Sequence, residues 1–239
     1  MQYKRYFIIF LTIITIFRLF YIWLGPLDLS PDEAHYWEWS RRLDLSYYSK
    51  GPMIAYLIAV LTAIGGNTEF AVRSGAVVIS IFISILLFVL ARDIFKSERA
   101  GFYAAILPSL TPLYSAGAIL MTIDSPFIFF WGLAVYVFRK AVINEGGGGK
   151  GQIAVSSQLP VGNRQLAVDC KLQTGNCNQW YLLGIIIGLG LLTKYTMALI
   201  YPCILLFLLL SKDDRYWLKT KEPYIALVLS VIVFSPVII

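Results

Sequence analysis

The stretch YFIIFLTIITIFRLFYIWLG, residues 6–25, decides the class of this protein. It carries a single charge, Arg18, and at about 20 residues it can cross the hydrocarbon core of a bilayer as a helix. It is too long for the apolar core of a usual secretory signal, and no small-x-small cleavage site follows it. We therefore expect a retained first membrane span, preceded on its cytoplasmic side by Lys4 and Arg5.

The composition of the whole chain agrees with the prediction of a membrane protein. Hydrophobic residues make up 58% of the 239 residues and charged residues 14%, with a mean hydropathy of +0.71. Soluble domains are nearer half apolar and carry about 25% charged residues. The composition thus excludes a soluble globular domain and predicts an all-α, polytopic membrane helix bundle. The net charge of +6 comes from basic residues scattered between apolar runs, which indicates membrane topology and not nucleic-acid binding.

Seven further apolar runs follow the first one. They lie at 51–65, 71–91, 101–121, 126–142, 181–193, 196–211 and 224–239. The groups of Lys and Arg between them are expected in the cytoplasm: Lys4 and Arg5; Arg92, Lys96 and Arg99; Arg139 and Lys140; and Lys212, Arg215, Lys219 and Lys221. This holds only if the chain crosses the membrane an even number of times between consecutive groups.

The run at 51–65 decides whether the number of membrane crossings between the first two basic groups is even. At about 15 residues it is marginal for a span, so we interpret it as an interfacial or re-entrant helix. Segment 26–70 then forms an extracytoplasmic loop with two interfacial helices. The chain returns at 71–91, exits at 101–121, re-enters at 126–142 and forms a hairpin over 181–211 whose tip is outside.

The whole chain, 1–239, is expected to form a single membrane domain. Because the last apolar run reaches Ile239 without a polar end, we expect the N-terminal part of a longer fold. Segment 146–178 interrupts the pattern with four glycines and a degenerate seven-residue repeat that lacks helical or strand periodicity. It is predicted to be a flexible cytoplasmic insertion.

Conspicuous polar residues fall on one side of this map. Asp32, Glu33 and His35 follow the first span, and Lys50 precedes the interfacial helix. Asp124 lies in the turn before the span at 126–142, and Lys194 lies at the hairpin tip. All reach the extracytoplasmic face, where carboxylates that accept protons and lysines that bind phosphate would line one cavity.

Each of these residues also has an ordinary structural interpretation. Ser30-x-x-Glu33 with Pro31 is a capping box, so the acids could simply begin a helix. A lone lysine at an interface often extends to the lipid headgroups. His35 is the only histidine, so a metal site built from this chain would need Glu33 or Asp32 as further ligands.

Five motifs in order resemble a known family. They are Asp32-Glu33 after the first span, Tyr-x-x-Lys50-Gly-Pro, Glu69-Phe-Ala-Val-Arg73, Thr-x-Asp124-x-Pro, and Leu-Leu-Thr-Lys194. Together they resemble the lipid-linked-sugar transferases of glycosyltransferase superfamily C. The nearest branch includes the bacterial lipid A aminoarabinose transferase and is related to the dolichyl-phosphate-mannose protein mannosyltransferases. The resemblance runs from the first span to about Leu210 and omits the insertion.

The resemblance implies roles for the polar residues. Asp32 would be the general base on the acceptor hydroxyl, with Glu33 positioning the acceptor or a divalent ion. Lys50 would bind the donor phosphate, Asp124 would be the second functional acid, and Lys194 would assist at the phosphate. The family usually has Lys-Pro-Pro where this chain has Lys50-Gly51-Pro52.

Further residues of the same loop complete the expected site. Stabilising the leaving phosphate favours additional cations, for which Arg41 and Arg42 are candidates. Residues expected to position donor or acceptor are His35, Tyr47 and Tyr48. No cofactor is certain, and a divalent metal at Glu33 and His35 is the one metal site considered.

The function implied is transfer of a sugar from a polyprenyl-phosphate donor to a hydroxyl or amine of a lipid, glycan or protein acceptor. An inverting reaction at the outer face of a bacterial inner membrane is expected. Two alternatives stay open: a polytopic transporter, which should show repeated spans and charges within broken helices, and a non-catalytic, truncated membrane paralogue.

Overall fold

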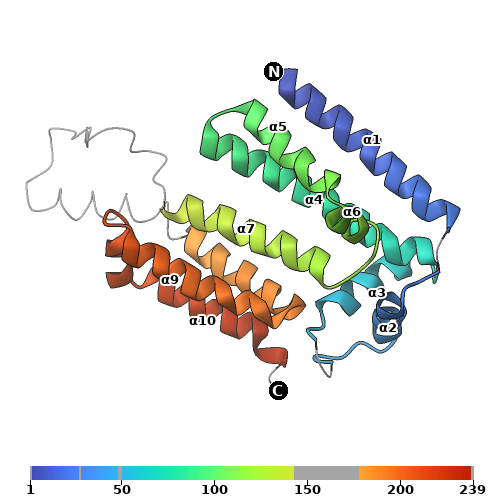
Figure 1. Ribbon diagram of the computed structural model, residues 1–239. Coiled ribbons are helices and arrows are strands. Elements are labelled where there is room, and N and C mark those ends of the chain that lie inside the picture. Colours follow the sequence, from blue (N-terminus) through green and yellow to red (C-terminus); the bar gives the residue numbers. More distant parts are fainter. Residues whose placement is uncertain (1, 27, 48–49, 143–177, 238–239) are drawn as a thin grey trace, which may run out of the picture.

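The computed structural model describes residues 2–26, 28–47, 50–142 and 178–237 as an assembly of helices (Figure 1). The α-helices are α1 Gln2–Leu24, α2 Pro31–Ser40, α3 Met53–Gly65, α4 Glu69–Phe95, α5 Glu98–Ile106, α6 Pro112–Gly117, α7 Asp124–Val142, the helix Asn178–Thr193, α9 Ile200–Leu210 and α10 Glu222–Phe234. Short 3-10 helices are η1 Leu107–Leu110, η2 Tyr195–Leu199, η3 Arg215–Lys219 and η4 Ser235–Val237. No strand occurs among the described residues, so the all-α prediction is confirmed.

Within the described ranges, three helices are long and apolar enough to cross a membrane: α1, α4 and α7. The side of α1 away from α4 exposes large apolar side chains such as Ile13 and Phe17, as expected for a helix in contact with lipid. Arg18 points inward instead and is 2% exposed. It donates hydrogen bonds to the hydroxyls of Ser80 (3.0 Å) and Ser109 (3.3 Å), which fixes α1 against α4 and η1.

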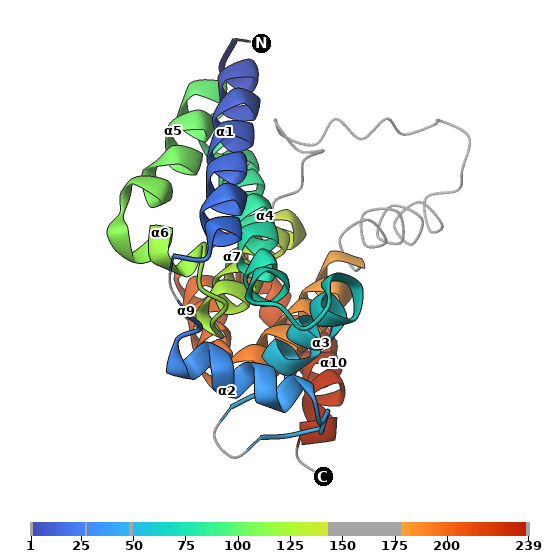
Figure 2. The same cartoon turned by 90° about the vertical axis from the view of Figure 1, so that its right-hand side faces the viewer.

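The predicted continuous span at 101–121 is wrong. The chain forms α5, η1 and α6 there, three short helices in succession. Pro108 and Pro112 explain the breaks, because proline has no N–H to donate and its ring clashes with the preceding turn. The three pieces still follow α4 back toward its N-terminal end, beside α1 (Figure 2).

The two helices predicted within 26–70 are both present. Thr68 caps the N-terminus of α4 by accepting from the Ala71 N–H, and α3 packs its buried Ile54 and Ile58 against α2 and α4. These contacts form a core cluster that also contains Met121 from the segment before α7. The segment between α1 and α4 is thus a packed part of the bundle.

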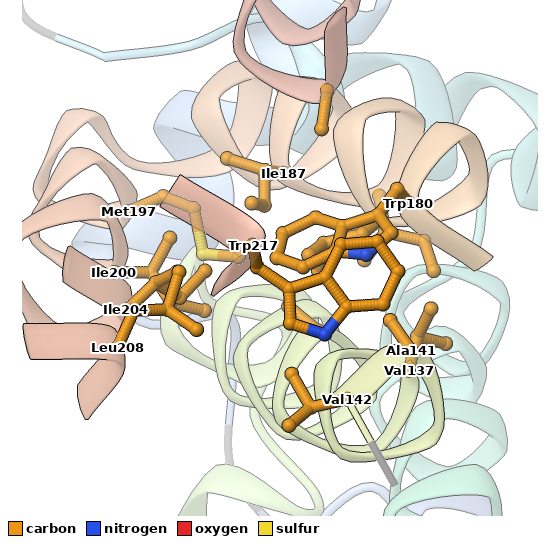
Figure 3. Close-up of a cluster of buried hydrophobic side chains, with 14 of the residues drawn as sticks. Val137, Ala141, Val142, Trp180, Ile187, Met197, Ile200, Ile204, Leu208 and Trp217 are labelled. Carbon is orange, nitrogen blue, oxygen red and sulfur yellow. The ribbon is translucent and has the colours of Figure 1, made fainter. Parts of the chain in front are cut away.

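A second cluster joins the helix Asn178–Thr193 and α9 to α7 (Figure 3). Trp180 and Trp217 lie with ring centroids 5.4 Å apart, among Val137, Ala141 and Leu208. The helix Asn178–Thr193 approaches α10 closely, since a Cβ at Gly184 would lie 2.4 Å from the Ala226 carbonyl oxygen. The predicted insertion at 146–178 lies, up to residue 177, outside the described residues.

The helices alternate in direction as the map of basic residues predicts. The end of α1, the helices α2 and α3, the start of α7 and the end of the helix Asn178–Thr193 gather on one side (Figure 1, right). The basic groups at 92–99, 139–140 and 212–221 lie toward the other side. The polar anchors named from the sequence therefore converge at one end of the bundle.

Candidate active site

One pocket lies where α2, the start of α7 and the turn after the helix Asn178–Thr193 meet. Its volume is about 390 Å³. The lining residues are Asp32, Tyr36, Lys50, Thr122, Ile123, Asp124, Thr193, Lys194, Tyr195 and Thr196. Four residues that the sequence placed on one face, Asp32, Lys50, Asp124 and Lys194, thus share a single cavity.

The capping box predicted from the sequence positions the first of them. The Ser30 hydroxyl accepts from the Glu33 N–H (3.3 Å), and the Glu33 carboxylate accepts from the Ser30 N–H (3.0 Å). This starts α2 at Pro31 and directs two neighbouring acids to different sides of the helix. Asp32 is exposed and lines the pocket, whereas Glu33 is fully buried.

Glu33 is where the structure departs most from the expected site. Its carboxylate forms a two-pronged ion pair with Arg73 of α4, at 3.1 Å to Nε and 2.9 Å to Nη2. It also accepts from the Met121 N–H at 2.9 Å. Burial alone would raise the pKa of this carboxyl, but the hydrogen bonds from Arg73, Ser30 and Met121 outweigh it and lower the pKa. Glu33 does not line the pocket, so it is not placed to contact an acceptor or a divalent ion there.

Lys50 enters the pocket from the segment before α3. Its ammonium donates a 2.9 Å hydrogen bond to the Tyr36 hydroxyl, which, with the nearby carboxylates of Asp32 and Asp124, raises the pKa of Lys50. No carboxylate lies within ion-pair distance of Lys50 among the described residues. Its charge is therefore available to an incoming anion.

Gly51 brings Lys50 to the helix that ends near Lys194. A Cβ at Gly51 would lie 1.9 Å from the carbonyl oxygen of Leu192, so only glycine permits this approach. The departure from the family's usual Lys-Pro-Pro thus has a structural counterpart: residue 51 meets the backbone of Leu192 directly.

Asp124 and Lys194 form an ion pair across the pocket. Their Oδ1 and Nζ atoms are 2.8 Å apart, and their side chains are 59% and 38% exposed. Exposed pairs of this kind contribute about 0–1 kcal/mol to stability, so the pair can open at little cost. Lys194 is neutralised by Asp124, which distinguishes it from Lys50.

Comparison with known proteins adds to this geometry. The family model for dolichyl-phosphate-mannose-protein mannosyltransferases matches residues 49–150 and 167–239. The chain belongs to this family. The matched ranges include Lys50, Asp124 and Lys194, and Asp32 precedes them.

The chain is also similar to curated bacterial proteins. The lipid A galacturonosyltransferase RgtD of Rhizobium johnstonii is 26% identical over 93% of this chain and 40% of its own length. The undecaprenyl phosphate-alpha-4-amino-4-deoxy-L-arabinose arabinosyl transferases of Pectobacterium atrosepticum and Wigglesworthia glossinidia brevipalpis are 27% and 26% identical, over 80% and 83% of this chain. The chain spans 40% of the first relative and about a third of the others, and no solved structure matches it significantly.

Several residues expected at the site lie outside the pocket. Trp39 stacks with Tyr47 (4.4 Å between centroids) and contacts the ring of His35 (4.5 Å). The Tyr47 hydroxyl donates to the backbone carbonyls of Trp39 and Arg42, which holds the loop after α2. His35, Tyr47, Arg41 and Arg42 are all absent from the pocket lining.

The remaining expectations concern a tyrosine, a cation and a metal. Arg41 lies over the ring of Trp37, 5.4 Å from its centroid, and Tyr48 lies outside the described residues. A metal held by Glu33 and His35 is not supported, because side chains two residues apart on a helix point in different directions and Glu33 is fully engaged. In the described part of the chain no group of three or more His, Cys, Asp or Glu side chains could hold a metal ion.

The structure also identifies pocket residues that the sequence analysis missed. Tyr36 is 2% exposed and holds Lys50. Hydroxyl side chains complete the lining: Thr122, Thr193, Tyr195 and Thr196. The signal for Tyr36 was available, since it lies four residues after Asp32 and so on the same face of α2.

An apolar groove adjoins the pocket. It lies between α4, η1 and α7, has a volume of about 440 Å³, and is lined by Leu86, Tyr114, Phe127 and Trp131 among others. Thr196 lines both the groove and the polar pocket. A molecule with a charged head and an apolar tail would therefore find matching surfaces side by side.

Proposed function

We propose that this protein transfers a sugar from a polyprenyl-phosphate donor to a hydroxyl or amine of a lipid, glycan or protein acceptor. The observation that carries the proposal is the shared pocket, in which the carboxylates of Asp32 and Asp124 face the ammonium groups of Lys50 and Lys194. The names of the bacterial relatives, which include undecaprenyl-phosphate sugar and lipid A transferases, support the same class of donor.

Lys50 is the residue best placed to bind the donor phosphate. It is held by a neutral hydroxyl, so a phosphate can approach it without breaking an ion pair. Lys194 can contribute a second positive charge when its weak pair with Asp124 opens. Two ammonium groups would then balance the negative charge that the phosphate gains as it leaves the sugar.

Asp32 is the proposed general base. The acceptor oxygen attacks the anomeric carbon as the bond from that carbon to the phosphate oxygen breaks. The electron pair of the broken bond leaves with the phosphate. The Asp32 carboxylate takes the proton of the attacking hydroxyl. A single displacement of this kind inverts the anomeric centre, by analogy with inverting glycosidases.

The apolar groove is the proposed path of the donor's lipid tail, because it opens beside the pocket and shares Thr196 with it. The site would face the exterior or periplasm of a bacterial inner membrane. The groups of Lys and Arg at 92–99, 139–140 and 212–221 support this orientation, since they lie toward the opposite end of the bundle.

Sugar transfer from radiolabelled polyprenyl-phosphate donors in membranes carrying the protein tests the proposal. Asp32→Asn removes the base without changing side-chain size and is expected to lower turnover by about 100-fold or more. Glu38→Gln, an exposed carboxylate on the same helix and outside the pocket, is the matched control. Undiminished transfer by Asp32→Asn would contradict the assignment of the base.

A further inference from the structure

Glu33 connects three parts of the molecule through one buried carboxylate. It caps its own helix α2 at Ser30, pairs with Arg73 of α4, and accepts from the backbone of Met121. Arg73 in turn donates to the Asp28 carbonyl at 2.7 Å, which ties the start of the loop to the same point. The Glu33 and Arg73 side chains are 0% and 3% exposed.

Two of the three walls of the pocket begin at this carboxylate, and the third is the turn that carries Lys194. On one side Asp32 is its neighbour in sequence, and Tyr36, which holds Lys50, lies one turn further along α2. On the other side Met121 leads directly through Thr122 to Asp124. Asp32 and Tyr36 thus lie within three residues of Glu33, and Asp124 lies three residues after Met121, whose N–H Glu33 binds.

Turn hydrogen bonds hold the backbone before Met121 as far as Leu120, and Glu33 holds the next N–H, that of Met121. α6 ends at Gly117, and α7 starts only at Asp124, so the segment between them lies outside regular helix. The Met121 N–H donates to Glu33 instead of to a carbonyl of a preceding turn. Met121 is fully buried, and its side chain packs close to Gly75 of α4.

We propose that Glu33, paired with Arg73, is a positioning residue. It sets the distance between the pocket wall that carries Asp32 and the pocket wall that runs from Met121 to Asp124. Its effect on sugar transfer rests on the proposed function, whereas its effect on geometry does not. Because the groups that act on donor and acceptor come from both walls, a shift of about 1 Å between them would lower turnover by about 100-fold.

A distance measurement tests the geometry directly. Spin labels at Glu38→Cys on α2 and Val135→Cys on α7, the helix that begins at Asp124, are at exposed positions and report the separation of the two walls by double electron–electron resonance. Serine replaces the native cysteines, Cys170, Cys177 and Cys203. Glu33→Gln or Arg73→Lys is expected to shift or broaden the distance distribution.

The control for the labels is Glu69→Gln, an exposed carboxylate one turn from Arg73, which should leave the distribution unchanged. Arg73→Lys retains the charge but loses the two-pronged geometry and, with it, the bond to the Asp28 carbonyl. It therefore remains informative if Glu33→Gln does not fold. An unchanged distribution in the folded variants overturns the proposal.

A charge exchange separates positioning from stability. Glu33→Arg with Arg73→Glu restores a buried ion pair but puts a donor opposite the Met121 N–H. We expect this double variant to regain much of the thermal midpoint lost by Glu33→Arg alone, while its turnover stays about 100-fold low and its donor KM stays within about threefold. Recovery of wild-type turnover would show that only the ion pair matters and would overturn the proposal.

The two experiments fail in different ways. If the wild-type protein transfers no sugar from any polyprenyl-phosphate donor, the proposed function is wrong, and the spin-label distances still decide the role of Glu33. If transfer occurs and Glu33→Gln retains full turnover, the proposed function stands and the positioning role is refuted.

Discussion

Gly51→Ala offers the sharpest test of how the pocket is built. The added Cβ would lie 1.9 Å from the carbonyl oxygen of Leu192, a separation that must grow to at least 3.0 Å, so one backbone must move by about 1.1 Å. The movement separates Lys50, which directly precedes Gly51, from the turn that carries Lys194. A displacement of about 1 Å at a reacting centre costs about 100-fold in rate.

The assay is transfer from a radiolabelled polyprenyl-phosphate sugar, with the thermal midpoint of the purified protein measured in parallel. We expect kcat/KM for the donor to fall by about 100-fold. Overpacking costs about 1–3 kcal/mol, which should also lower the midpoint without unfolding the protein at the assay temperature.

Two controls sharpen the result. Gly117→Ala adds a Cβ that meets nothing within 4 Å and should retain wild-type transfer. Combining Gly51→Ala with Leu192→Ala should not rescue transfer, because the nearest contacts are with the Leu192 backbone. Wild-type transfer by Gly51→Ala would refute the close approach and the pocket geometry that depends on it.

Two further predictions concern the charged residues. Lys50→Met should weaken donor binding by about 10- to 100-fold, since a hydrogen bond to a charged group contributes about 1.5–3 kcal/mol. Lys194→Met, whose charge Asp124 already balances, should weaken it by about threefold, and equal losses in titrations with a donor analogue would contradict the distinction. The lowered pKa of Glu33 means that its stabilisation is present above the ordinary carboxyl pKa of 4.5 and is lost as the pH falls through the lower folded value. Thermal midpoints of wild type and Glu33→Gln should therefore differ strongly at pH 7, by the equivalent of about 3–5 kcal/mol, and this difference should begin to shrink as the pH falls below 4.5; a constant difference down to the acid limit would argue against the ion pair.

Much of the fold could be predicted because its signals are local. Apolar length located α1, α4 and α7, and the capping box located the start of α2. The break at 101–121 was missed, although Pro108 and Pro112 were visible, because a hydropathy run records apolar length and not helix continuity. The sequence likewise gave no reason to expect that Arg18 would bond hydroxyl groups.

The candidate site, too, could be predicted only in part from the sequence. The pattern of basic residues put Asp32, Lys50, Asp124 and Lys194 on one face, and the structure brings them into one pocket. The capping box distinguished Glu33 from Asp32 as a residue that begins a helix, but the sequence did not show that Asp32 alone of the two would line the pocket. Their difference arises from the ion pair between α2 and α4, which buries one carboxylate on Arg73 and leaves the other exposed.

The sequence by itself determined a helical membrane protein and the shared face of its polar residues, because hydrophobicity, charge bias and caps act over a few residues. Only the tertiary structure decided which of those residues form the pocket. That decision depends on contacts between distant segments, above all the approach of Gly51 to Leu192 and the bonds from Glu33 to Arg73 and Met121. Such contacts depend on the packing of whole helices, which no local pattern records.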